Sequence, residues 1–186
     1  MTLAEAPYVV APGFIEPRMA RMLYDMLLIR QWRGEGKRDN QVPGAQSHWG
    51  DSTLDALLVS LLPAVESVSG QSLLPTYAYA RLYQTGDHLP RHRDRAACEV
   101  AVTLHLGHSG NRPPPIRFEP DIAVEQKPGD AVVYRGDQLD HWREPFCGDN
   151  FGQVFLNYVY AAGSRRHLVH DGRRGAFPPS LNGRPR

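Results

Sequence analysis

The second half of the chain is a series of short segments with β-strand character, separated by turns. The first, "TYAYARLYQ" (residues 76–84), alternates large and small side chains at the period of two that is typical of a strand. The later segments are "CEVAVTLHLG", "PIRFEP", "GDAVVYRG", "HWREPF" and "GQVFLNYVYA". Turn-forming pairs such as Pro128-Gly129 lie between them. Many short antiparallel strands restrict the chain to a sandwich or an open barrel.

Two helices are predicted before these strands. In "EPRMARMLYDMLL" (residues 16–28), five apolar residues share one helical face that we expect in the core: Met19, Met22, Leu23, Met26 and Leu27. The second helix begins at Asp51 or Ser52, and Pro63 is expected to break or kink it. Its buried face is formed by Leu54, Leu57, Leu58, Leu61 and Leu62. Helices followed by strands predict an α+β domain.

The composition fits a single globular domain. The chain has 186 residues, of which 41% are hydrophobic and 22% are charged. The net charge of +1 gives no general sign of nucleic-acid or membrane binding. The charge is uneven, because residues 163–186 contain six arginines and three prolines. We therefore expect one domain over residues 1–162, with its strand core at residues 75–160, and a basic tail over residues 163–186.

Cysteine usage and the N-terminus predict a cytoplasmic protein. Two cysteines, Cys98 and Cys147, are too few for a disulfide framework or a thiolate zinc cluster. Reduced thiols are favoured over a single bridge between them. The N-terminal residues lack the basic start and apolar core of a signal peptide. No run approaches the roughly 18 apolar residues that a membrane span needs, so we expect no membrane attachment. The oligomeric state stays open.

The stretch "LPRHRDRAACE" places His92 and Asp94 two positions apart. In a strand, residues i and i+2 lie on the same face, so both side chains can converge on one metal ion. Two histidines and one carboxylate form the ligand set of non-haem Fe(II) oxygenases, which leaves the opposite face of the metal open. The third ligand should follow a later strand, and His141 does so in "KPGDAVVYRGDQLDHWRE".

The order of these segments resembles the Fe(II)- and 2-oxoglutarate-dependent dioxygenases, and it is most similar to the prolyl-4-hydroxylase-like branch. The resemblance covers residues 77–160 and rests on "RLYQTGDHLPRHRD", "KPGDAVVYRGDQLDHWRE" and "GQVFLNYV". It implies a double-stranded β-helix, a jelly-roll or cupin-like fold, with N-terminal supporting helices. It also implies that Fe(II) is bound by the catalytic residues His92, Asp94 and His141, with 2-oxoglutarate and O₂ as co-substrates.

The co-substrate pocket departs from the pattern of this family. The far (C5) carboxylate of 2-oxoglutarate needs a buried cation, because an unpaired buried carboxylate is costly. In the resembling enzymes a lysine or arginine downstream of the distal histidine supplies it, but Phe151 stands there in this chain. Arg143 is the expected substitute, since a guanidinium grips a carboxylate with two hydrogen bonds. Its alternative role is an ion pair with Glu144, and Arg81 is the alternative cation.

Four further residues are candidates for contact with the co-substrate. Tyr83 matches the tyrosine of the Tyr-x-x-Gly stretch that precedes His-x-Asp in the family. Thr103 and His105 alternate onto one strand face, where either can supply a hydrogen bond to the C5 carboxylate. Gln153, on the following strand, can assist. The alternative for Tyr83 is aromatic packing, and the alternative for Thr103 and His105 is placement in the core or at the surface.

Three residues are candidates for contact with the substrate: Arg95, Arg81 and Trp142. For Arg95 the alternative is an ion pair with Glu99, and for Trp142 it is burial in the core. Residues 34–52 are rich in Gly, Asn, Asp and Ser, which predicts a long loop and a candidate lid.

The resemblance implies hydroxylation of an unactivated C–H bond in an amino acid, a peptide or protein side chain, or a small metabolite, with release of succinate and CO₂. The Asp94 ligand argues against a halogenase, which needs that position vacant for chloride. The alternative is oxidative demethylation of alkylated nucleic-acid bases, although "QVFLNYVYA" lacks the arginines usual in such demethylases. A binding module that holds metal without turnover is the third possibility.

Overall fold

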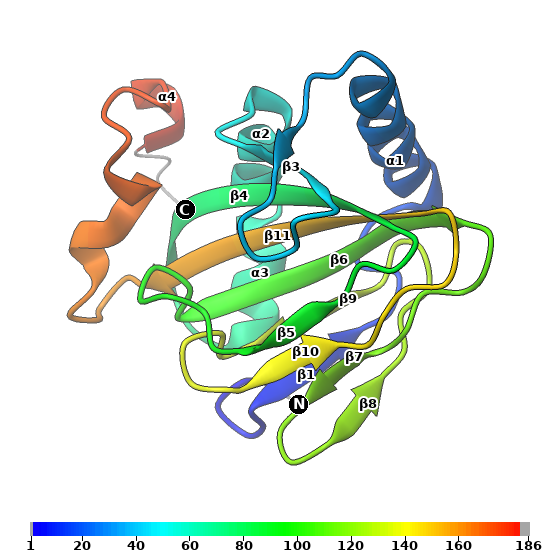
Figure 1. The fold of residues 1–186 in the computed structure, drawn as a ribbon. Helices are drawn as coiled ribbons and strands as arrows, with labels where there is room; N and C mark the ends of the chain where they lie inside the picture. The colour runs from blue at the N-terminus through cyan, green and yellow to red at the C-terminus, as the bar shows by residue number, and fades with distance from the viewer. Residues whose placement is uncertain (1, 183–186) are drawn as a thin grey trace.

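The computed structural model describes residues 2–182, which form two antiparallel sheets with helices packed on the larger one (Figure 1). The large sheet has the strand order β1 (Tyr8–Ala11), β9 (Ala131–Tyr134), β6 (Val100–Ser109), β11 (Asn150–Tyr160), β4 (Leu73–Gln84), β3 (Gln46–Trp49) and β2 (Lys37–Arg38). The small sheet has the order β5 (Leu89–His92), β10 (His141–Arg143), β7 (Ile116–Phe118) and β8 (Ile122–Val124). The predicted combination of helices with antiparallel strands is confirmed.

Helix α1 (Pro17–Trp32) packs on β6 and β11 through a face that overlaps the predicted one at Leu23 and Leu27. Its buried residues are Ala20, Leu23, Tyr24 and Leu27. Met19 and Met22 are 41% and 58% exposed, so their assignment to the core was wrong. The reason lies in the sheet: a Cβ added at Gly107 or Gly152 would lie 2.9 or 2.8 Å from the Tyr24 ring. Because these two glycines have no side chain, the Tyr24 ring fits against the sheet, and the helix turns its Tyr24 face toward the core.

Helices α2 (Ser52–Ser60) and α3 (Leu62–Ser69) follow the predicted pattern. The Asp51 carboxylate caps α2 by accepting from the backbone N–H groups of Thr53 and Leu54, at 2.9 and 3.2 Å. The chain bends by 47° between the two helices, next to Pro63. Within residues 2–182 no single helix is long and apolar enough to cross a membrane; only α2 and α3 taken together meet those criteria, by length and composition alone.

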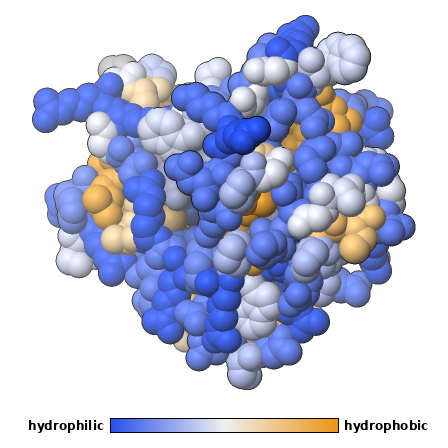
Figure 2. Space-filling model, viewed as in Figure 1, coloured by the Kyte–Doolittle hydropathy of each residue, from blue (hydrophilic) through white to orange (hydrophobic). Residues whose placement is uncertain are grey.

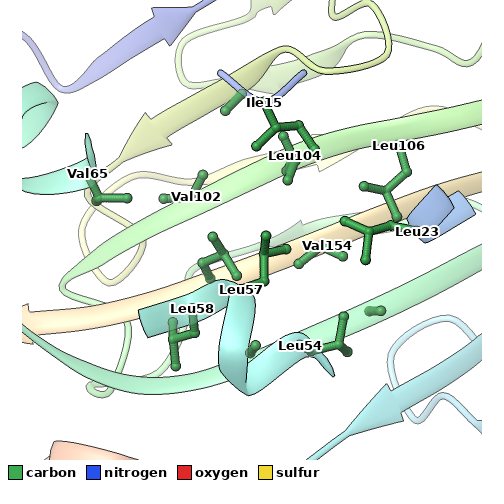
Figure 3. Close-up of a cluster of buried hydrophobic side chains, with 14 of the residues drawn as sticks. Ile15, Leu23, Leu54, Leu57, Leu58, Val65, Val102, Leu104, Leu106 and Val154 are labelled. Atoms are coloured by element: carbon green, nitrogen blue, oxygen red, sulfur yellow. The ribbon is translucent and has the colours of Figure 1, made fainter. Parts of the chain in front are cut away.

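The main hydrophobic core lies between the helices and the large sheet. Figure 3 shows this cluster, in which Leu57 and Leu58 of α2 pack with Leu104 of β6 and Val154 of β11. Burying each such side chain contributes about 1.5–3 kcal/mol. A second cluster lies between the two sheets and includes Phe118 and Tyr134. It packs β7 and β8 of the small sheet against β9 of the large sheet.

The predicted loop at residues 34–52 contains two strands that the sequence did not indicate. β2 and β3 form a hairpin, and β3 pairs with β4 at the edge of the large sheet. Strand β8 was likewise not predicted. Strand β6 continues to Ser109, beyond the end of the predicted segment "CEVAVTLHLG", and so includes His108.

The C-terminal segment lies against the core as far as it is described. It contains a 3₁₀ helix (Arg166–Gly172) and a short helix α4 (Pro179–Asn182). Phe177 joins the main core cluster. Arg173 pairs with Asp55 of α2 at 2.7 and 3.0 Å. The rest of the predicted tail, residues 183–186, lies outside the described residues, and the domain boundary at residue 162 stays a prediction.

Candidate metal centre and adjoining cavity

Two paired strands of the small sheet bring the three predicted metal ligands together. His92, the last residue of β5, lies directly opposite His141, the first residue of β10. Asp94 lies just beyond β5. Its Oδ1 is 3.4 Å from Nε2 of His92 and 3.7 Å from Nε2 of His141. One ligand atom from each residue lies within 4.8 Å of the other two. With metal–ligand bonds of about 2 Å, these atoms can reach one ion.

Both imidazole rings turn Nε2 toward the carboxylate. Nδ1 of His92 lies 2.8 Å from the Pro90 carbonyl, and Nδ1 of His141 lies 3.0 Å from the Leu139 carbonyl. A carbonyl only accepts hydrogen bonds, so these contacts assign the proton to Nδ1 and leave the Nε2 lone pair free. Burial lowers the pKa of His141, which favours the neutral ring that binds a metal.

Tyr134, from β9, lies beside the second oxygen of Asp94. Its buried hydroxyl is 3.4 Å from Asp94 Oδ2 and 3.3 Å from His141 Nε2. If Nε2 binds a metal, Asp94 Oδ2 is the acceptor left for this hydroxyl, and buried hydroxyls rarely lack a partner. Gly136 leaves room for this oxygen, since an added Cβ would lie 2.5 Å from it. Asp94 is therefore directed to bind a metal through Oδ1.

Replacing Tyr134 with phenylalanine should weaken Mn(II) binding by about 10- to 100-fold, the usual effect of removing a hydrogen-bond partner of a metal ligand. The ring contact with His141, at 4.8 Å between centroids, stays in place, so only the hydroxyl is lost. Titration calorimetry measures the affinity. Tyr8→Phe is the matched control, because Tyr8 stacks on Phe118 at 4.9 Å and is not one of the residues that could hold the metal. Equal affinities of the two variants would contradict this role for Tyr134.

A cavity of about 550 Å³ adjoins the three ligands. Its volume lies within the range of about 300–1,000 Å³ that is typical of small-molecule sites. The β2–β3 hairpin forms one wall, and β4 and β11 contribute Tyr77, Tyr79, Phe155 and Asn157. Figure 2 shows the surface in the same view as Figure 1. This face is mainly hydrophilic, with a few hydrophobic side chains between the polar ones.

Arg143 is a buried cation in this cavity and has no carboxylate partner among residues 2–182. It is 4% exposed and does not pair with Glu144. Its Nη1 donates to the Pro114 carbonyl and its Nη2 to Gln126 Oε1, each at 2.8 Å. In the described chain its Nε has no hydrogen-bond partner. Burial lowers the pKa of Arg143 to about 10. An uncompensated buried charge is costly, so this arrangement favours an anionic ligand.

Arg81, the other candidate cation, already has an acidic partner. Its Nε donates to Asp39 at 2.8 Å, its Nη1 to the Tyr83 hydroxyl and its Nη2 to Gln41 Oε1, both at 3.0 Å. Tyr79 also donates to Asp39. Burial alone would raise the pKa of Asp39, but the charge and hydrogen bond of Arg81 hold it below its usual range. The guanidinium thus fixes the residues that follow β2 against β4.

Thr103, His105 and Gln153 do not line the cavity; they form a buried polar layer connected to Arg143 through Gln126. Gln126 donates to the Thr103 carbonyl at 2.9 Å, and His105 Nδ1 lies 3.0 Å from the Gln126 carbonyl. Gln153 Nε2 donates to Thr103 Oγ1 at 3.1 Å, while its Oε1 has no partner in the described chain. If the Gln153 side-chain amide is rotated by 180°, its oxygen and nitrogen exchange places, and the Thr103 hydroxyl donates to the amide oxygen. Gln153 then presents a free N–H₂ group, which suits a carboxylate.

Tyr83 also lies outside the cavity lining. Its ring stacks on Phe151 at 5.4 Å between centroids, and its hydroxyl accepts from Arg81. The sequence did not single out Tyr134, Gln126 or Asp39. Tyr134 ends an apolar strand and reads as core, and the other two lie in loops without a periodic signal. Only the fold brings them to the site.

Of the candidate substrate residues, Arg95 lines the cavity beside Asp94. It pairs with Asp171 rather than Glu99, at 2.7 and 2.5 Å, and its guanidinium lies 4.3 Å from the centre of the Tyr77 ring. This contact places part of the C-terminal segment next to a residue of the cavity.

Trp142 does not line the cavity, because alternation along β10 directs it to the face opposite His141. The Arg91 guanidinium lies 5.0 Å from the centre of its ring. Arg91 and Arg93 both pair with Asp140, at 3.0 and 2.5 Å. Glu119 also lies near both arginines, 3.3 Å from Arg91 and 4.0 Å from Arg93. The two carboxylates balance the two positive charges, which gives little support to binding of a polyanion such as nucleic acid.

The residues present fit Fe(II) and 2-oxoglutarate. Imidazole nitrogens and a carboxylate oxygen are the donors that non-haem Fe(II) sites use. Arg143 follows His141 by two strand residues, roughly 7 Å along the strand. Its unpaired Nε suits the far carboxylate of a short dicarboxylate whose other end binds the metal.

The sequence matches no family model and no curated protein. Among solved structures, a prolyl-4-hydroxylase from Pseudomonas putida is 19% identical with a TM-score of 0.67, over 83% of this chain and 94% of that chain. A prolyl hydroxylase from Trichoplax adhaerens, in complex with a peptide of hypoxia inducible factor, is 14% identical with a TM-score of 0.68, over 84% and 85%.

The non-heme α-ketoglutarate (2-oxoglutarate)-dependent epimerase SnoN from nogalamycin biosynthesis is 13% identical with a TM-score of 0.69, over 86% of this chain and 80% of that chain. At these identities the likeness shows the fold. The chain shares the fold of these prolyl hydroxylases and of this 2-oxoglutarate-dependent epimerase, as its sequence pattern predicted.

Proposed function

We propose that this chain is an Fe(II)- and 2-oxoglutarate-dependent dioxygenase that hydroxylates an unactivated C–H bond of an amino acid, a peptide or protein side chain, or a small metabolite, with release of succinate and CO₂. One observation carries the proposal: a complete His/Asp/His ligand set and a buried arginine without an acidic partner meet in the same cavity. The two antiparallel sheets and the position of the ligands at one end of the small sheet support a double-stranded β-helix.

In this proposal His92, Asp94 and His141 hold Fe(II), and Tyr134 fixes the carboxylate ligand. The bound metal supplies the activation of O₂ and the oxidation of the C–H bond. Arg143 binds the C5 carboxylate of 2-oxoglutarate, which orients the other end of that molecule toward the metal.

The buried polar layer assists Arg143: Gln126 orients the guanidinium, Thr103 and His105 hold Gln126, and Gln153 offers a further donor. Tyr83 acts indirectly, by orienting Arg81. Burial lowers the pKa of His105 to about 4, so this ring is neutral at physiological pH and adds no second charge beside Arg143.

Hydroxylation is the proposed outcome because the ligand set is complete and two of the similar structures are prolyl hydroxylases. The fold alone does not decide the reaction, since one of these structures is an epimerase. Demethylation of nucleic-acid bases has less support, because the arginines that flank His92 are paired with Asp140.

The test is succinate formation by the purified protein with Fe(II), 2-oxoglutarate and O₂, measured by NMR. We expect slow turnover without added substrate that requires all three components and stops when a chelator removes the metal. His92→Ala serves as the inactive control. Binding of Mn(II) and 2-oxoglutarate without any succinate would overturn the proposal in favour of a binding module.

A further inference from the structure

Most of the charges that line the cavity are balanced. Asp39 and Arg81 form a buried pair at 2.8 Å, and Arg95 is paired with Asp171. In the proposed function the remaining inner charges also cancel. The two positive charges of Fe(II) and the one of Arg143 balance the single charge of Asp94 and the two of 2-oxoglutarate.

Two cations of the cavity are left over, Lys37 and Arg38 of β2. Both line the cavity and both are exposed. Within residues 2–182 neither forms an ion pair or a side-chain hydrogen bond, and no lining carboxylate remains without a partner or an expected ligand. The site loaded with metal and co-substrate therefore keeps two positive charges at its outer wall, and a cleft with one sign of charge attracts ligands of the opposite sign.

The backbone of β2, which carries these cations, is held by contacts with β3 and β4. Lys37 pairs with Ser47 in the β2–β3 register, and the Ser47 hydroxyl donates to the Lys37 carbonyl at 3.2 Å. The next residue after Arg38 is Asp39, which is tied to Arg81 of β4. A buried ion pair adds little net stability but can select one arrangement of the chain. Here the selected arrangement keeps the β2 backbone beside the cavity.

The strands that follow β2 in the large sheet give the cavity a largely aromatic wall. Trp49, Tyr77, Tyr79 and Phe155 line it, and the rings of Tyr79 and Phe155 are 5.9 Å apart between centroids. Such a surface suits an apolar or aromatic body. The cavity thus offers positive charge on β2, aromatic rings on β3, β4 and β11, and the candidate metal ligands on the small sheet and just beyond β5.

From this arrangement we propose that the substrate is a small molecule with a carboxylate or phosphate group that binds Lys37 and Arg38, and an apolar body that places a C–H bond at the metal. The proposal rests on the proposed function, because it concerns the second ligand of the same cavity. It disfavours cationic substrates, which the outer wall repels. A polyanion is disfavoured because Arg91, Arg93 and Arg95 are already paired.

The experiment uses the full chain loaded with Mn(II) and 2-oxoglutarate, and measures the paramagnetic relaxation of probe protons by NMR. The probes share one apolar body and differ in charge: 3-phenylpropionate, 3-phenylpropanamide, 3-phenylpropylamine and 2-phenylethyl phosphate. We expect the carboxylate or the phosphate to bind about fivefold more tightly than the amide, as suits exposed charge pairs of up to about 1 kcal/mol, and the amine to bind most weakly. Whichever anion binds better identifies the charged group.

The double variant Lys37→Gln/Arg38→Gln should lose this preference, with binding of the amide unchanged. The matched control Arg18→Gln/Lys127→Gln removes the same charge from exposed positions outside the cavity lining and should keep the preference. The inference is overturned if the anions bind no better than the amide or do not bind at all. It is also overturned if the double variant keeps the preference, or if a single-stranded oligonucleotide displaces the small anions.

The two proposals fail in different ways. If Mn(II) or 2-oxoglutarate does not bind, or if Fe(II) gives no succinate, the proposed function fails. If both bind and succinate forms while the probes show no preference for negative charge, only the inference about the substrate fails.

Discussion

His141→Ala should abolish succinate formation and weaken Mn(II) binding by more than the roughly 100-fold upper limit seen when only a partner of a ligand is removed. The reason is geometric. His141 lies opposite His92 in the strand pair, and its Nε2 is one of three donors that surround the metal position. Without His141, only His92 and Asp94 are left to bind the metal, and water takes the third position. Titration calorimetry with Mn(II) and NMR detection of succinate measure the two effects separately.

The matched control for this variant is His88→Ala. His88 is exposed and lies four residues before His92, so its loss changes the histidine content of the same region without touching the ligand set. It should retain metal binding and turnover. Succinate formation by His141→Ala at the rate of the unaltered chain would show that the metal lies elsewhere.

The cluster of His92, Asp94 and His141 was predictable because each part of its signal is local. His92 and Asp94 lie two positions apart at a strand end, and His141 follows a recognisable turn and apolar strand. What the sequence did not contain is the register that sets the two histidines opposite each other. Register depends on how all strands of the small sheet pair, and a single segment does not specify it.

Other parts of the site were unpredictable for physical reasons. Strand β2 has only two residues and is held by the pair Asp39–Arg81, whose members are 42 positions apart. Tyr134 looks like one more apolar strand residue until the fold brings Asp94 beside it. The buried face of α1 depends on Gly107 and Gly152, which make room for Tyr24. Both glycines lie outside the helix, so the periodicity of the helix sequence contains no information about them.

Arg143→Met should raise the dissociation constant of 2-oxoglutarate by about 100- to 4,000-fold, because breaking a buried charge pair costs about 3–5 kcal/mol. Mn(II) affinity should be nearly unchanged, since Arg143 does not contact the ligand atoms of the metal site. Arg143→Lys should show a smaller loss, because an ammonium does not form the two parallel hydrogen bonds of a guanidinium. Calorimetric titration of 2-oxoglutarate into the Mn(II)-loaded protein measures these constants.

Arg95→Met is the matched control, since Arg95 also lines the cavity but already has Asp171 as its partner. It should bind 2-oxoglutarate as the unaltered chain does. If Arg143→Met instead binds 2-oxoglutarate normally, Arg81 becomes the cation for the C5 carboxylate, and Asp39 would then have to exchange its partner when 2-oxoglutarate binds. The contacts in the structure disfavour that exchange. All three nitrogens of Arg81 donate to protein acceptors. Nε of Arg143, in contrast, has no acceptor within the described chain.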